Sequence, residues 1–327
     1  PLNRANNLLL DLNKEIKIIK VEQDIDDKVN ENLQTSQKQF ILKEKLREIK
    51  KELGEKSLKD EDVEKFNDTL NKLNLNERTA RKLQDEIEKY SLASDNSPET
   101  TILRNYIDML LSLPWNKSSK EITDINKVKK ALDSTHYGLQ EIKERVIEYV
   151  GVKKLNPTLC SPIICLIGPP GVGKTSIACS IASSLNREFI KISVGGLNDS
   201  TELIGSRRTY LGANPGKIIQ GLKKCGTNNP VILIDEIDKM VKDYKGDPAS
   251  TLLEILDPIQ NENFVDNYIE EPFDLSHVFF ILTANLEQDI PSTLLDRLEI
   301  INLNSYTEYE KLSISKKYLI PNIYKEY

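Results

Sequence analysis

A glycine-rich octapeptide between two apolar runs constrains this chain more than any other stretch. Residues 168–175 read GPPGVGKT and match the spacing G-x-x-x-x-G-K-[ST]. The preceding run, Ile163–Ile167, is apolar and largely β-branched, which predicts a buried strand. The following run, Ser176–Leu185, carries apolar residues at helical spacing. A strand, a glycine loop and a helix in this order predict a phosphate-binding loop.

The residue types of this loop predict how a nucleoside triphosphate would be held. Backbone N–H groups of the loop and of the helix start would surround the phosphates, favoured by the helix dipole. Lys174 would reach the β- and γ-phosphates, and the Thr175 hydroxyl would ligate Mg²⁺. The predicted nucleotide-binding residues are Gly168, Pro169, Pro170, Gly171, Val172, Gly173, Lys174, Thr175 and Ser176.

Two adjacent acids follow a second apolar run. The run Val231–Ile234 predicts a buried strand, and Asp235 and Glu236 come directly after it. At the end of that strand Asp235 can reach the Mg²⁺ held by Thr175. Glu236 is placed to orient and polarise the water that attacks the γ-phosphate. The pair therefore predicts hydrolysis as well as binding.

Two polar residues further along are weaker candidates. Asn285 ends the next apolar run, and the C-terminal ends of parallel strands line the ligand crevice. It could hydrogen-bond the γ-phosphate or the water, or simply form an Asx turn. Arg297 follows on a predicted short helix, where it could reach a neighbouring subunit's γ-phosphate or be an ordinary surface residue.

A turn upstream of the phosphate loop offers two further candidates. His136 and Tyr137 precede Gly138 and a predicted helix from Leu139 to about Lys154. They could bracket the adenine base or be ordinary turn residues, and the pattern leaves both interpretations open.

The order of apolar runs predicts the fold class. Strands alternating with helices indicate an α/β domain, a parallel sheet with helices on both faces. The first half of the chain instead predicts helices. Residues 2–53 contain neither proline nor glycine and predict a long, coiled-coil-like helix, followed by shorter helices. The predicted strands are residues 163–167, 189–193, 231–234, 278–282 and 300–303, and the later predicted helices include 217–224, 248–257 and 292–298.

Composition narrows the class of partner. The chain has 327 residues with 45 Lys and Arg against 51 Asp and Glu, a net charge of −6. This balance does not indicate a dedicated nucleic-acid binder, although a local basic patch stays possible. Four cysteines without C-x-x-C spacing predict neither a zinc site nor a disulfide framework. No apolar run approaches the ~18 residues of a membrane span. The chain opens on Pro1, so we expect a piece of a longer protein.

Longer strings extend these motifs to a family resemblance. The order GPPGVGKT, LIDEIDK, TAN and LLDR resembles AAA+ ATPases. The strings SLPWNK, HYGLQEIKERVIEY, SRRTYLGANPGKIIQGLKK, GDPASTLLEILDPIQN and FVDNYIEEPFDLS closely resemble the Lon family of ATP-dependent proteases. The similarity covers roughly residues 37–327.

The resemblance implies roles for the residues that match the family's motifs. Lys174, Glu236 and Asn285 would be catalytic, Thr175 and Asp235 would hold Mg²⁺, and ATP would be the nucleotide. Arg297 would be an arginine finger acting on the neighbouring subunit. Tyr210 and Leu211 match the pore loop that grips substrate, and an aromatic side chain can grip an extended polypeptide without demanding a sequence. Tyr210 as a half-buried turn residue is the alternative.

The resemblance also implies an assembly and a domain division. We expect a helical arm over residues 1–115, an AAA+ nucleotide-binding domain over 116–305, and the start of a helical lid over 306–327. The partners would be further copies in a homo-oligomer, a hexameric ring, and unfolded or damaged proteins. The proteolytic domain would lie beyond residue 327.

The compartment would be the cytoplasm, or the mitochondrial matrix in a eukaryote. The alternatives are an AAA+ unfoldase without a protease, a nucleic-acid motor, and an inert oligomerisation module.

Overall fold

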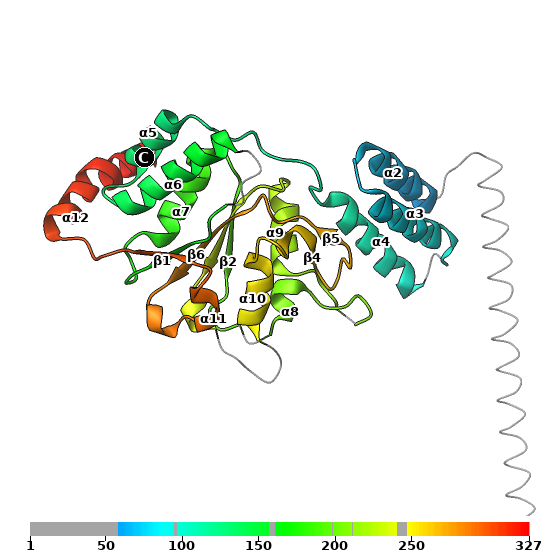
Figure 1. The fold of residues 1–327 in the computed structure, drawn as a ribbon. Coiled ribbons are helices and arrows are strands. Elements are labelled where there is room, and N and C mark those ends of the chain that lie inside the picture. The colour runs from blue at the N-terminus through cyan, green and yellow to red at the C-terminus, as the bar shows by residue number, and fades with distance from the viewer. Residues whose placement is uncertain are drawn as a thin grey trace, which may run out of the picture. The chain divides into compact units, whose positions relative to one another are not determined.

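In the computed structural model, the described residues are 58–94, 97–156, 161–197, 199–210, 212–240 and 247–326. The chain divides into two compact units, residues 1–64 and residues 65–327. The predicted long helix of residues 2–53 lies outside the described residues. Figure 1 shows the elements of the second unit, which carries every predicted site residue.

A five-stranded parallel sheet forms the centre of the second unit (Figure 1). The strand order is β2-β3-β6-β1-β7, and all four neighbouring pairs run parallel. The predicted parallel sheet is therefore confirmed, each predicted strand within two residues of its observed ends. The strands are β1 (Ile164–Ile167), β2 (Phe189–Ser193), β3 (Val231–Asp235), β6 (Phe279–Ala284) and β7 (Glu299–Asn302).

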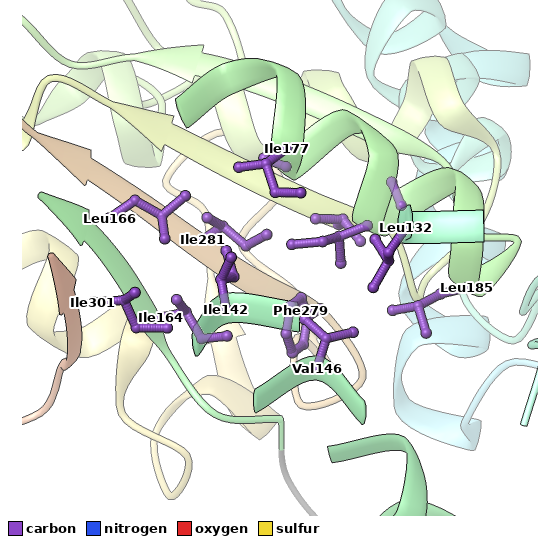
Figure 2. Close-up of a cluster of buried hydrophobic side chains, with 14 of the residues drawn as sticks. Leu132, Ile142, Val146, Ile164, Leu166, Ile177, Leu185, Phe279, Ile281 and Ile301 are labelled. Atoms are coloured by element: carbon purple, nitrogen blue, oxygen red, sulfur yellow. The ribbon is translucent and has the colours of Figure 1, made fainter. Parts of the chain in front are cut away.

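Helices cover both faces of this sheet. On one face, α5 (Ile125–Thr135), α6 (Gln140–Leu155) and α7 (Lys174–Leu185) bury alternate strand residues in one apolar cluster (Figure 2). Phe189 packs against that cluster, so its neighbour Ile190 points to the opposite face. There Ile190 lies against Gly221, at the middle of α9 (Lys217–Cys225). The small residue lets the helix approach the sheet closely. The core members labelled in Figure 2 are Leu132, Ile142, Val146, Ile164, Leu166, Ile177, Leu185, Phe279, Ile281 and Ile301.

The predicted helices 217–224 and 248–257 end within one residue of the observed ones, and a third predicted helix is shorter than expected. The predicted helix 292–298 ends at Leu295, because the chain turns at Asp296 and enters β7 at Glu299. A small antiparallel pair, β4 (Phe264–Val265) with β5 (Pro272–Phe273), was not predicted because each strand has only two residues. The other helices are α2 (Leu58–Lys72), α3 (Glu77–Leu92), α4 (Pro98–Ser112), α8 (Thr201–Ile204), α10 (Pro248–Leu256), α11 (Ser292–Leu295), α12 (Glu308–Ile314) and α13 (Ile320–Glu326). Three short 3-10 helices, η1 (Ile237–Lys239), η2 (Asn261–Asn263) and η3 (Glu287–Asp289), and a π-helix, η4 (Ser315–Leu319), complete the described elements.

Helices α3 and α4 pack on the segment around β5. The fully buried Tyr106 of α4 donates a hydrogen bond to the carbonyl of Ile269 at 2.7 Å. Trp115, just after α4, lies 5.2 Å from the ring of Phe273. These contacts join the helical segment after residue 65 to the sheet domain. None of the described helices is both long and apolar enough to span a membrane.

Candidate nucleotide-binding and hydrolysis site

The phosphate loop connects β1 to α7, as its sequence predicts. Gly173 is the N-cap of α7 and has a φ of +93°, which a side chain would strain. Gly168 lies close to the residue that follows β7, and a Cβ on Gly168 would be 2.3 Å from the carbonyl oxygen of that residue, Leu303. The glycines therefore set both the turn and its approach to the sheet.

The register of the sheet gathers polar residues beside this loop. Ile167 of β1 pairs with Ala284 of β6, so Asn285 follows at the same edge as Gly168. The Thr283 hydroxyl donates to the Asp235 carboxylate and accepts the backbone N–H of Glu236 at 3.1 Å. Thr283 thus fixes the end of β3 against β6.

Glu236 has an unusual backbone conformation. Its φ is +65°, in the left-handed region that side chains other than glycine rarely adopt. Its carboxylate lies over Gly195, where an added Cβ would be 2.4 Å from Oε2, and it forms an ion pair with Lys239. Strained conformations of this kind cluster at active sites.

Lys174 and Asn285 are in direct contact. Lys174 Nζ donates to Asn285 Oδ1 at 2.8 Å and to the carbonyls of Gly168 and Pro169. The Asn285 backbone N–H donates to Asp238 Oδ2 at 3.0 Å. The other oxygen of Asp238 is buried and has no hydrogen-bond partner. Asp238 therefore holds the backbone of Asn285, whose side chain contacts the lysine.

These residues surround one cavity of about 380 Å³. It lies at the C-terminal ends of β1, β3 and β6, where ligands bind in open parallel sheets. The lining residues are Pro170, Gly171, Gly173, Lys174, Thr175, Ser176, Asp235, Glu236, Asp238, Thr283, Ala284 and Asn285.

The charges in the cavity shift two pKa values. Burial raises the pKa of Asp235, but hydrogen bonds from Lys191 and Thr283 and the charges of Lys191 and Lys174 outweigh it and hold that pKa below its usual value. Lys191 Nζ lies 2.7 Å from Asp235 Oδ2. Burial lowers the pKa of Lys174, although Asp238 and Asp235 oppose this effect. Asp235 is therefore ionised at neutral pH.

The oxygen donors fit a hydrated Mg²⁺. Thr175 and Asp235 both line the cavity, and the described residues contain no group of three or more His, Cys, Asp or Glu that could hold a metal ion by itself. In nucleotide sites Mg²⁺ is bound by one or two protein oxygens together with phosphates and water. Such a site needs no larger cluster.

The structure brings His136 to the phosphate loop. Its Nε2 lies 2.8 Å from the hydroxyl of Ser176, and Lys143 Nζ donates to its backbone carbonyl at 2.7 Å. Burial, helped by the charge of Lys143, lowers the pKa of His136 to about 4. The imidazole is therefore neutral at physiological pH. Tyr137 is not among the cavity residues, and its ring lies 5.9 Å from Nζ of Lys317.

Two predicted residues lie away from the cavity. Arg297 pairs with Asp257 at 2.6 Å, and its side chain is 42% exposed. Tyr210 is 66% exposed and lies in the connection between α8 and α9, residues 205–216, which we name the Tyr210 loop. Leu211 lies outside the described residues.

Sequence reasoning missed three residues of the site: Thr283, Asp238 and Lys191. The first two had a signal, because Thr283 precedes Asn285 within the same TAN string and Asp238 is the second aspartate of DEIDK. Lys191 had only a weak signal, a charged residue in the middle of an apolar strand. Its contact depends on the pairing of β2 with β3, which the sequence does not specify.

Comparison with known proteins identifies the class of this domain. The model of the ATPase family associated with various cellular activities (AAA) matches residues 164–306. The chain therefore contains an AAA ATPase domain, and all the residues that line the cavity described above lie within it.

The relatives of the chain are more specific. It is 50% identical to the Lon protease of Clostridioides difficile over 314 residues, which is 96% of this chain and 40% of that protein. It is 47% identical to the Lon protease of Chloroherpeton thalassium over 324 residues, 99% of this chain and 39% of that protein. Over nearly its whole length, the chain is a homologue of the Lon proteases. It spans about two fifths of the length of these curated relatives.

Proposed function

We propose that this chain is the ATP-hydrolysing motor of a Lon-type protease, which unfolds protein substrates and moves them to a proteolytic domain. The observation that carries the proposal is the single cavity in which Lys174 and Thr175 face Asp235, Glu236 and Asn285. This arrangement occurs in a chain that is half identical to a Lon protease.

The proposed chemistry assigns one role to each group. Lys174 binds the β- and γ-phosphates, and Thr175 and Asp235 hold Mg²⁺, which supplies charge neutralisation on the phosphates when bound. Glu236 orients and polarises the attacking water. Asn285 contacts Lys174 and would pass to the γ-phosphate or the water once nucleotide enters.

Two side chains near the loop are proposed to meet the adenine base. The contact of His136 with Ser176 supports this role, because Ser176 follows the Mg²⁺ ligand Thr175 directly. Tyr137 would bracket the base from the same turn. A neutral imidazole suits such a contact, because it adds no charge beside the base.

Arg297 is proposed to act on the neighbouring subunit of a homo-oligomeric ring, a hexamer by resemblance. Its side chain is 42% exposed, and this exposure supports a position that serves another copy. A mixture tests this directly: Arg297→Ala and Glu236→Gln should each be inactive alone, and rings mixed from the two should regain ATPase activity. No recovery on mixing would contradict action between subunits.

Tyr210 and Leu211 are proposed to grip the translocating polypeptide. The exposure of Tyr210 at the tip of its loop supports this role.

Residues 1–115 would be a helical arm, residues 116–305 the motor domain, and residues 306–327 the start of the lid. The site of action would be the cytoplasm.

The variant Glu236→Gln tests the hydrolytic assignment. It keeps the size of the side chain but removes the carboxylate that polarises water. We expect turnover to fall by about 100-fold or more while the dissociation constant for ATP changes less than about threefold. Turnover equal to that of the wild type would contradict the proposal.

A further inference from the structure

The base of the Tyr210 loop is fixed to the body of the domain by hydrogen bonds whose donors are backbone N–H groups. Gly216 donates its N–H to the buried Asp266 at 2.7 Å. The N–H of Asn267 donates to the carbonyl of Ile204 at 2.7 Å, just before the loop begins. Both ends of the loop therefore rest on the segment between β4 and β5.

The tip has only local backbone bonds among the described residues. The N–H of Tyr210 bonds to the carbonyl of Arg207 at 3.0 Å, and the N–H of Ala213 bonds to the carbonyl of Tyr210 at 3.1 Å. These bonds shape the turn, but they do not attach it to anything outside the loop. Another contact must set the position of Tyr210 relative to the domain.

Arg208 makes that contact with the helices α3 and α4. Its two terminal nitrogens lie 3.2 and 3.4 Å from the two carboxylate oxygens of Glu86 on α3. Its guanidinium carbon stacks 4.7 Å from the ring centre of Tyr106 on α4. The Glu86 side chain is only 3% exposed, and a two-pronged pair of this kind fixes orientation as well as distance.

The surroundings of Glu86 keep it charged for this purpose. Burial raises the pKa of Glu86, but the hydrogen bonds and charges of Lys89 and Arg208 lower it by more, so the net shift is downward. Lys89 bonds to the same carboxylate at 3.1 Å from within α3 and does not touch the loop. Lys89 is therefore a natural control for the pair.

We propose that Arg208 is a positioning residue that anchors the Tyr210 loop to helix α3 through Glu86. A load applied to Tyr210 would then reach α3 and α4 as well as the sheet domain. The coupling to substrate rests on the proposed grip of Tyr210, whereas the anchoring itself does not.

The test measures hydrogen–deuterium exchange of backbone amides in residues 206–216 in four variants of the protein. Arg208→Leu should raise exchange at Tyr210 and Ala213 about tenfold, because it removes every contact that Arg208 makes outside the loop. Glu86→Gln should give a smaller rise of about threefold, because Arg208 keeps its stack on Tyr106 and its pair with Glu270 at 3.9 Å. Arg208→Lys keeps the positive charge but loses the two-pronged guanidinium contact, and it should give an intermediate rise in exchange. The control Lys89→Met should stay within twofold of the wild type. In both Arg208 variants Glu86 keeps Lys89, in Lys89→Met it keeps Arg208, and in all four variants Tyr106 keeps its bond to Ile269.

A functional measurement separates this inference from the proposed function. With casein as an unfolded substrate, Arg208→Leu should raise the casein concentration for half-maximal ATPase stimulation at least about fivefold, with basal ATPase unchanged within twofold. Unchanged exchange in Arg208→Leu and Glu86→Gln would overturn the anchoring, even if Tyr210→Ala abolished stimulation. Raised exchange together with normal stimulation in Tyr210→Ala would instead overturn the substrate role of Tyr210 and leave the anchoring in place.

Discussion

The phosphate-loop cavity and the Tyr210 loop belong to one compact unit but are held by different kinds of contact. The cavity is built from strand ends whose positions follow from the sheet register, so Asp235, Thr283 and Asn285 meet without long side chains. The Tyr210 loop depends on Arg208 reaching Glu86, 122 residues earlier in the chain. The hydrogen-bonded register of the sheet holds the cavity rigidly. The Tyr210 loop is held by one long side chain, that of Arg208, so a load on Tyr210 can move the loop.

The first prediction concerns the cavity and has the largest expected effect. Lys174→Ala leaves Asp238, Asp235 and Glu236 in the cavity without the lysine that faces them. These acids would repel a triphosphate, so ATPase activity should fall about 100-fold or more and ATP binding should weaken strongly. Steady-state ATPase rates and titration calorimetry measure both. The exposed Lys223 provides the control, since Lys223→Ala should change neither quantity.

The second prediction breaks the base of the Tyr210 loop without touching the cavity. A Cβ on Gly216 would lie 2.0 Å from the carbonyl oxygen of Leu203, and this backbone group cannot move aside freely. Gly216→Ala should therefore lower the free energy of unfolding by about 2–3 kcal/mol in urea titrations, with ATP affinity retained.

Gly212 supplies the matched control for that variant. It has a φ of +79° but open space around an added Cβ, so Gly212→Ala should cost only about 1 kcal/mol, from backbone strain. Equal losses in the two alanine variants would show that the close contact at Gly216 does not matter.

The third prediction is smaller and concerns the pH dependence of stability. The pKa of His136 is about 4 in the folded chain against an ordinary value of 6.5. Between these two pH values the unfolded chain binds more protons than the folded chain. The contribution of His136 to the free energy of unfolding is therefore present above pH 6.5 and is lost as the pH falls toward 4. His136→Gln should remove this dependence. The difference in unfolding free energy between wild type and variant should shift by about 1 kcal/mol from pH 7 to pH 5, allowing for partial exposure.

Chemical denaturation at the two pH values measures that shift. A difference between wild type and variant that stays constant from pH 7 to pH 5 would contradict the neutral, partly buried imidazole in contact with Ser176.

The sequence predicted the cavity far better than the surroundings of Tyr210. The strand before Gly168, the acids after β3 and Asn285 after β6 are local patterns, and a parallel sheet places such strand ends at one edge. Arg208 lies within the same string as Tyr210, but nothing local indicates that its partner is a buried glutamate on α3. The two-residue strands around Asp266 were equally invisible, because they are too short to show a period. Contacts between distant side chains depend on the final packing, which no single stretch encodes.

The most direct test of the distinction between the two regions is the ATPase rate of Tyr210→Ala with and without casein. Because the cavity is built independently of the loop, we predict a basal rate within about twofold of the wild type and a loss of casein stimulation, with stimulation retained in Tyr210→Phe. A basal rate that falls as far as that of Glu236→Gln, or full stimulation in Tyr210→Ala, would contradict the account.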